Sequence, residues 1–126
     1  MNEEIAKVIL KSEDFLEDAD CLFEGKRFVA VINRSYYAMF TIVQGLLLTK
    51  GVFSKTHQGT MSKFHELFIK TGSLPVELGK VLNETFAKRQ FGDYDVEADI
   101  SEEEALKVAE EAKMFVNKIK IFLGFN

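Results

Sequence analysis

The sequence predicts an all-α protein, an antiparallel up-and-down helical bundle of about five helices. Apolar residues recur at intervals of three and four along most of the 126-residue chain, which is the period of one helix face. The chain holds only 1 proline and 8 glycines, too few for the many turns of an all-β protein. The connecting segments are short, so consecutive helices should pack side by side. We expect residues 1–126 to form a single domain.

The first two helices are expected over residues 3–24 and 26–50. The first carries one apolar stripe, and Gly25 follows it as a residue suited to the left-handed conformation that ends many helices. The second is apolar almost all round, with 15 hydrophobic residues among the 21 of residues 28–48. Arg34 interrupts this stretch, which favours burial in protein over a membrane span. Because such a helix lies at the centre of a bundle or at a subunit interface, we predict a homodimer.

Three further helices follow. The third is expected over residues 57–71, and the fourth over residues 75–90, where the proline suits a first helical position. The fifth has the cleanest apolar stripe of the chain and opens with a capping box that begins at Ser101. An acidic loop is expected between the last two helices, over residues 91–100.

The net charge of −4 is unevenly distributed. Residues 1–24 carry a net −6, residues 25–92 a net +7, residues 93–111 a net −8 and residues 112–126 a net +3. One interpretation is charge balance between neighbouring helices. The other is that the middle helices present a surface suited to phosphates. The pattern leaves both open.

The sequence contains no motif that holds a metal or a cofactor. It has no Gly-rich phosphate loop and no CxxC pair, and His57 and His65 are eight residues apart without an acidic or cysteine partner at metal-ligand spacing. We therefore predict no metal site and no cofactor. Cys21, the single cysteine, cannot form an internal disulfide, and no apolar signal segment opens the chain. We expect a cytoplasmic protein without a membrane span.

Charged side chains fall on apolar faces of two expected helices. Arg89 is directed toward the bundle interior, where a charge needs a partner, and Asp93 follows it by four residues. The alternative is a helix-end cation whose stem reaches solvent. Arg34 shares a helix face with Tyr37. It reaches a polar cleft or a dimer interface, or it forms a buried ion pair with Asp93 or Asp95.

The two histidines lead to different expectations. His65 lies on an apolar face, which favours a core histidine with satisfied hydrogen bonds. His57 follows Lys55 and Thr56 at a helix start, where backbone N–H groups attract anions and the lysine adds positive charge. The alternative there is ordinary capping by Thr56. Lys55 and His57 are therefore candidate binding residues.

Four short blocks carry a family resemblance: NRSYYAMF at residues 33–40, KTHQG at 55–59, KTG at 70–72 and RQFGDY at 89–94. In their order and spacing they resemble the small stand-alone HEPN-domain family. The resemblance implies a helical bundle that dimerises and a partnership with a minimal nucleotidyltransferase. In many members of that family the pair forms a toxin–antitoxin system, and the HEPN chain is a metal-independent ribonuclease.

The family's catalytic motif is an arginine, a polar residue, three variable residues and a histidine. Arg89 and Gln90 match its first two positions, and Tyr94 stands where the histidine is expected. Tyrosine, with a pKa near 10, is a poor base at neutral pH. Arg89 can still stabilise phosphate charge, and Asp93 is the candidate base, unless His57 or His65 folds into the site.

Three functions are consistent with the sequence. The first is a nucleotide- or RNA-binding component of a toxin–antitoxin-like system with a nucleotidyltransferase, its dimer cleft lined by Arg34, Tyr37, Arg89, Asp93 and Tyr94. The second is an active metal-independent ribonuclease toxin that uses Arg89 and Asp93. The third is a purely structural dimeric module whose polar cleft only sets the register of the two chains. We favour the first.

Overall fold

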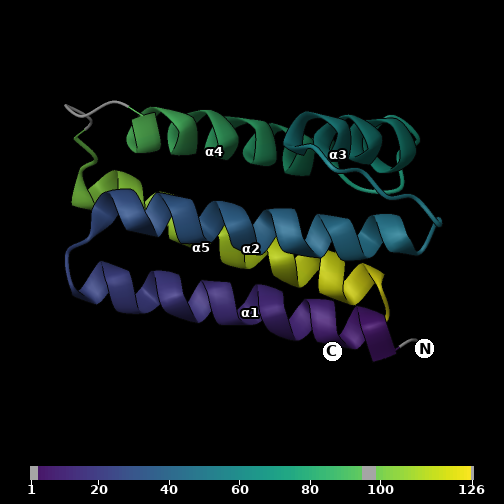
Figure 1. Cartoon of the computed structure of the whole chain (residues 1–126), viewed down its shortest axis with the longest axis horizontal. Helices are drawn as coiled ribbons and strands as arrows, with labels where there is room; N and C mark the ends of the chain where they lie inside the picture. The colour runs from purple at the N-terminus through teal and green to yellow at the C-terminus, as the bar shows by residue number, and fades with distance from the viewer. Residues whose placement is uncertain (1–2, 95–98, 126) are drawn as a thin grey trace.

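The computed structural model describes residues 3–94 and 99–125, and the side chains of residues 91–94 are not described. Its helices are α1 (Glu3–Glu24), α2 (Phe28–Leu48), α3 (His57–Phe64), the π-helical turn η1 (His65–Ile69), α4 (Val76–Tyr94) and α5 (Glu102–Phe122). Every regular element in these two segments is a helix, and the four long helices alternate in direction (Figure 1). This confirms the predicted all-α bundle.

α2 is the central helix of the bundle. It packs against α1, α3, α4 and α5, and Figure 1 shows it between α1 and α4. Thirteen residues of α2 are buried within the single chain. The apolar character of this helix is therefore explained by its neighbours in the same chain. It gives no support for a homodimer, which remains an expectation from the family resemblance alone.

Several helix boundaries differ from the sequence prediction. α2 is shorter than residues 26–50, while α4 continues to Tyr94, so the loop expected from residue 91 onward is wrong for its first four positions. Gly92 is the only helix-weakening residue there, and one glycine costs a helix only about 1 kcal/mol. Without a proline, α4 has no reason to end before Tyr94.

The third predicted helix is interrupted by the π-helical turn. The N–H of Lys70 donates to the carbonyl oxygen of His65 at 2.7 Å, five residues back. The His65 ring packs against α4 at Gly79, where an added Cβ would lie 2.6 Å from its Cε1. Its Nε2 lies 3.2 Å from Nδ2 of Asn83, so the histidine has a hydrogen-bond partner as expected. It is half-buried at the edge of the bundle and not a core residue.

Ion pairs connect α5 to its neighbours. Lys113 lies 2.9 Å from Asp20, and Lys120 lies 2.8 Å from Glu13, so the basic second half of α5 neutralises part of acidic α1. These contacts support the charge-balance interpretation for the two terminal helices. No helix in the described part of the chain combines the length and apolarity needed to cross a bilayer.

The left-handed residue that ends α1 is Lys26, at φ 59°, and not Gly25 as the sequence suggested. The N–H of Lys26 donates to the carbonyl of Phe23, and that of Arg27 donates to the carbonyl of Leu22, both at 2.9 Å. These are the two hydrogen bonds of a Schellman motif, whose left-handed residue here comes one position after the glycine.

Replacing Lys26 with glycine should therefore stabilise the protein. A left-handed conformation costs a non-glycine residue about 1–2 kcal/mol, and the added freedom of glycine in the unfolded chain offsets part of this gain. We expect Lys26→Gly to raise the free energy of unfolding by about 0.5–1 kcal/mol, measured by urea denaturation. The matched control is Gly25→Ala, which should not destabilise. A less stable Lys26→Gly protein contradicts this explanation of the helix end.

Candidate functional site

An aromatic cluster joins α2, α3 and α4. Tyr36 of α2 is fully buried, and its ring centroid lies 5.7 Å from that of Phe40 and 5.6 Å from that of His57. His57, the first residue of α3, stacks on Phe40 with 4.4 Å between ring centroids. Phe86 of α4 lies 5.4 Å from Tyr36 and 6.0 Å from His57. The imidazole is thus held by contacts from two helices besides its own.

Thr56 fixes the position of His57 at the start of α3. The Thr56 hydroxyl accepts a hydrogen bond from the N–H of Gly59 at 2.9 Å, which is ordinary N-capping. The capping alternative from the sequence is therefore correct. The cap also fixes where α3 begins, and this places the His57 imidazole against Tyr36 and Phe40 of α2.

The Tyr36 hydroxyl and His57 form a short hydrogen bond. The oxygen lies 2.6 Å from Nδ1 of the imidazole. Burial raises the pKa of Tyr36 above its ordinary value of 10.0, and burial together with the positive charge of Arg89 lowers the pKa of His57 below 6.5. Both side chains are therefore neutral at pH 7. The phenol is the stronger donor and the imidazole nitrogen the stronger acceptor, so Tyr36 donates to Nδ1 and Nε2 carries the ring proton.

Arg89 of α4 lies against the two adjacent tyrosines of α2. Its Nη2 donates to the hydroxyl of Tyr37 at 3.0 Å. Its Cζ lies 5.2 Å from the Tyr37 ring centroid and 5.6 Å from the Tyr36 ring centroid, both within the range of cation–π attraction. The guanidinium is half-buried and turned toward α2, not extended from the helix end into solvent.

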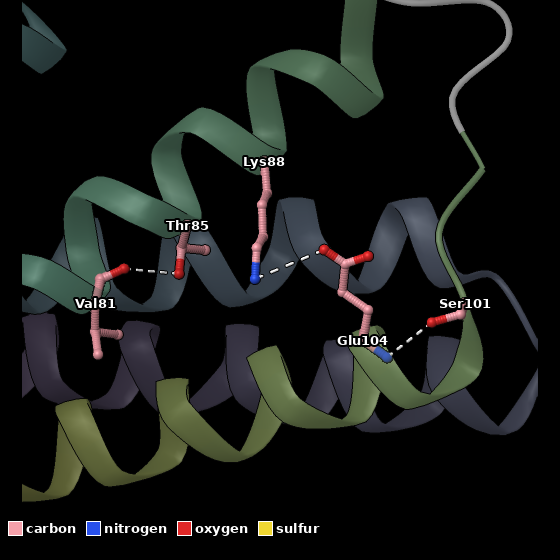
Figure 2. Close-up of polar contacts among 5 residues, drawn as sticks. All are labelled: Val81, Thr85, Lys88, Ser101 and Glu104. Carbon is pink, nitrogen blue, oxygen red and sulfur yellow. Dashed lines mark hydrogen bonds and ion pairs between the residues drawn. The ribbon is translucent and has the colours of Figure 1, made fainter.

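The neighbouring residue Lys88 helps to set this orientation. Its Nζ lies 3.6 Å from a carboxylate oxygen of Glu104 in the first turn of α5 (Figure 2). The N–H of Glu104 in turn donates to the hydroxyl of Ser101 at 3.1 Å, which confirms Ser101 as the cap of α5. Successive helix residues are rotated by about 100°, so a Lys88 turned to α5 leaves Arg89 facing α2.

The other predicted cations are exposed. The Cζ of Arg34 lies 5.9 Å from the ring centroid of Phe15 of α1, and that ring lies 6.0 Å from the ring of Tyr37. The dimer cleft that Arg34 is expected to share with Arg89 stays a prediction. Lys55 is exposed in the turn before α3.

Three residues named from the sequence have side chains outside the described part of the structure. The side chains of Asp93 and Tyr94 lie outside those described, although their backbone forms the last turn of α4. Asp95 lies outside the described residues altogether. The predicted pairing of Arg89 with Asp93, and that of Arg34 with either aspartate, therefore stay predictions.

Comparisons with known proteins identify the family. The sequence profile of the HEPN domain matches residues 5–122. The chain belongs to the HEPN family. It is 39% identical over 120 residues to "Putative toxin MJ0142" of Methanocaldococcus jannaschii, a match that covers 95% of this chain and 82% of the relative. It is 35% identical over 120 residues to "Putative toxin MJ0605" of the same organism, covering 95% and 89% of the two chains. A "UPF0332 protein" of Thermotoga maritima is 36% identical over 110 residues, covering 87% and 83%.

The geometry changes how the HEPN motif of this chain is interpreted. Tyr94 occupies the motif position of the histidine, but His57 from a different helix contacts the same Tyr36 ring as Arg89. Burial lowers the pKa of this imidazole, and the positive charge of Arg89 lowers it further. An arginine and a histidine therefore share a site in this HEPN chain, although they are far apart in the sequence.

Sequence reasoning missed Tyr36, the residue that links this histidine to this arginine. It lies on the apolar face of α2 and is fully buried, so its pattern is that of a core aromatic. The available signal was a pair of tyrosines within an otherwise apolar helix, because a buried tyrosine hydroxyl usually has a hydrogen-bond partner.

The lowered pKa of His57 can be tested by NMR. As pH falls through 6.5, an unfolded histidine takes up a proton while folded His57 stays neutral, so this residue lowers stability from pH 6.5 down to its folded pKa. We expect the His57 imidazole resonances of the folded protein to titrate with a midpoint below 6.5. Arg89→Met should raise that midpoint while burial still holds it down. A midpoint at or above 6.5 in the wild type contradicts this account of the site.

Proposed function

We propose that this HEPN chain binds RNA through Arg89 and His57, as the toxin-like component of a two-component system with a nucleotidyltransferase. The single observation that carries the proposal is the Arg89 guanidinium, held on the rings of Tyr36 and Tyr37 beside a neutral imidazole. Two relatives that carry the name "Putative toxin" support the same role.

The site has the donors that a phosphodiester requires. Arg89 offers a planar set of N–H groups suited to phosphate oxygens, and Nε2 of His57 offers a further N–H. Among the hydrogen bonds of the described residues, His57 uses only its Nδ1, and none involves its Nε2. Tyr37 is half-buried, so part of its ring is accessible to a base that stacks on it. The net +7 of residues 25–92 attracts a polyanion to these helices.

The homodimer and the nucleotidyltransferase partner are part of the proposal, and the resemblance of the chain's motifs to the HEPN family supports them. Light scattering of the purified chain tests the dimer. Co-expression with a nucleotidyltransferase encoded beside this reading frame, followed by affinity capture, tests the partner. A monomeric chain would contradict the homodimer, and failure to capture a nucleotidyltransferase would contradict the partnership. RNA binding would then be the only part of the proposal that remains.

RNA binding is tested by fluorescence anisotropy with a labelled single-stranded RNA. A charge-assisted hydrogen bond contributes about 1.5–3 kcal/mol, so Arg89→Ala should weaken binding by a factor of about 10 or more. Arg89→Lys should recover only part of the affinity, because an ammonium lacks the planar donor set. The control is Lys118→Ala, which removes an exposed cation of α5. Equal affinities for wild type and Arg89→Ala would remove Arg89 from the site.

A second candidate function is metal-independent RNA cleavage. The observation that favours it is the neutral His57 beside Arg89. In this reaction the ribose 2′-oxygen bonds to phosphorus as its proton passes to Nε2, the bond from phosphorus to the 5′-oxygen breaks, and solvent protonates the leaving oxygen. His57 must first change to its other neutral tautomer: solvent takes the proton from Nε2 and a proton from solvent is returned to Nδ1, whose N–H then donates to the Tyr36 oxygen.

Cleavage is tested with purified protein and RNA in the presence of a chelator. His57→Ala should abolish the activity, whereas His65→Ala, which removes the other histidine, should retain it. Asp93→Asn tests the base that the sequence suggested. The activity should fall as pH is lowered through the pKa of His57, while RNA affinity should rise because a protonated imidazole adds charge. RNA that stays intact at high protein concentration would contradict the cleavage function and leave RNA binding as the only proposed activity.

A further inference from the structure

An open groove lies where α1 turns into α2. Its volume is about 550 Å³. Its lining combines apolar side chains, among them Leu22, Phe28 and Val29, with the two arginines Arg27 and Arg34. In Figure 1 the α1–α2 turn and the C-terminal end of α4 lie at the same end of the bundle. The groove therefore lies at the same end of the bundle as the C-terminal end of α4, the helix that carries Arg89.

The two arginines of the groove are available to an anion. Both are exposed, and neither forms an ion pair with a carboxylate of the described residues. By contrast, Lys113 and Lys120 are engaged with acidic residues of α1. Glu24, exposed at the end of α1, is an opposing charge at this turn. Arginines beside apolar and aromatic surface suit a ligand that carries both negative charge and flat apolar groups.

Contacts connect this groove to the site at Arg89. The guanidinium of Arg34 lies over the Phe15 ring at 5.9 Å, and the Phe15 ring lies 6.0 Å from that of Tyr37. Tyr37 in turn holds Arg89, at 5.2 Å from its ring centroid. Cations and aromatic rings thus alternate from the groove to the site. Phe15 and Tyr37 are half-buried, so each ring keeps an accessible part.

We propose that the groove binds single-stranded RNA that extends beyond the nucleotide held at Arg89, an inference that rests on the proposed function. Arg27 and Arg34 are separated by about 10 Å along α2, so the groove spans more than one nucleotide. The strand is single because its bases must be unpaired to contact aromatic side chains such as Phe28 and Phe15. An acidic protein segment would supply negative charge but no bases to stack, which makes RNA the better fit.

The experiment compares a long and a short RNA. Labelled octauridylate and diuridylate are titrated by anisotropy with wild type, Arg27→Ala, Arg34→Ala, Arg89→Ala and the control Lys118→Ala. Exposed charge pairs are worth up to about 1 kcal/mol, so Arg27→Ala and Arg34→Ala should each weaken octauridylate binding about fivefold. Neither should change diuridylate binding. Each lost phosphate contact should also reduce the slope of log affinity against log salt concentration by about 0.7.

The outcomes separate this inference from the function on which it rests. If Arg89→Ala weakens both RNAs while Arg27→Ala and Arg34→Ala change neither, the groove has no role and RNA binding at Arg89 stands. If the wild type binds neither RNA, the proposed function fails and the groove inference fails with it. Equal affinity for an RNA duplex of eight base pairs overturns the single-stranded assignment. Displacement of octauridylate by an octaglutamate peptide at equal concentration reassigns the groove to an acidic protein partner.

Discussion

Replacing Tyr36 with alanine should lower the free energy of unfolding by about 3–5 kcal/mol, the range for loss of a large buried aromatic ring. The ring is fully buried, and it contacts Phe40, His57, Phe86 and the guanidinium of Arg89. Its removal leaves a cavity at the junction of α2, α3 and α4. Since domains of this size are stable by only about 5–15 kcal/mol, the loss is a large part of the total.

Urea denaturation followed by circular dichroism measures this loss, and two variants act as controls. Tyr36→Phe keeps the ring and removes only the hydroxyl that bonds His57, so it should cost about 1 kcal/mol. Tyr37→Ala removes a half-buried ring and should cost less than Tyr36→Ala. A Tyr36→Ala protein as stable as Tyr36→Phe would show that the ring does not hold the three helices together.

Replacing Gly45 with alanine should destabilise the protein at the α1–α2 interface. An added Cβ would lie 2.7 Å from Cγ1 of Val8 and 3.3 Å from its Cβ, closer than packed atoms approach. Valine is stiff at χ1 within a helix, so its side chain cannot rotate away at little cost. Overpacking costs about 1–3 kcal/mol, which exceeds the gain of about 1 kcal/mol from replacing a helical glycine with alanine.

Shortening Val8 should remove most of this cost. In a Val8→Ala background the methyl group at 2.7 Å is absent and only the 3.3 Å approach to the Cβ remains, so Gly45→Ala should be much less destabilising than in the wild type. A double-mutant cycle by urea denaturation measures the difference as a coupling energy of about 1–3 kcal/mol. Coupling near zero would show that the two helices do not meet closely at this point.

The helices could be predicted because their signals are local. The stripe over residues 3–24 reproduces α1, and the cap at Ser101 marks the start of α5, since both depend on spacing and on side chains within one turn. Errors occurred where a local signal was weak. The fourth helix was expected to end at residue 90, where no proline or capping residue marks an end, and α4 continues to Tyr94. The left-handed residue after α1 is Lys26 because the hydrogen bonds of the Schellman motif fix it there.

The candidate site was only partly predictable. Arg89, Tyr37 and His57 were each named from the sequence, because each is a polar or charged group in an unexpected place. Their meeting at Tyr36 was not predictable, and neither was the position of Arg34 over the Phe15 ring, because both depend on how side chains from different helices pack.

The sequence by itself determined an all-α bundle of the HEPN family, with an arginine turned inward on the fourth predicted helix. Only the tertiary structure decided which histidine accompanies that arginine. The HEPN motif position holds Tyr94, and His57 reaches the site because the start of α3 packs on Phe40 and Tyr36 of α2. Helix formation depends on neighbours within a few residues, whereas contacts between helices depend on how all their side chains pack together.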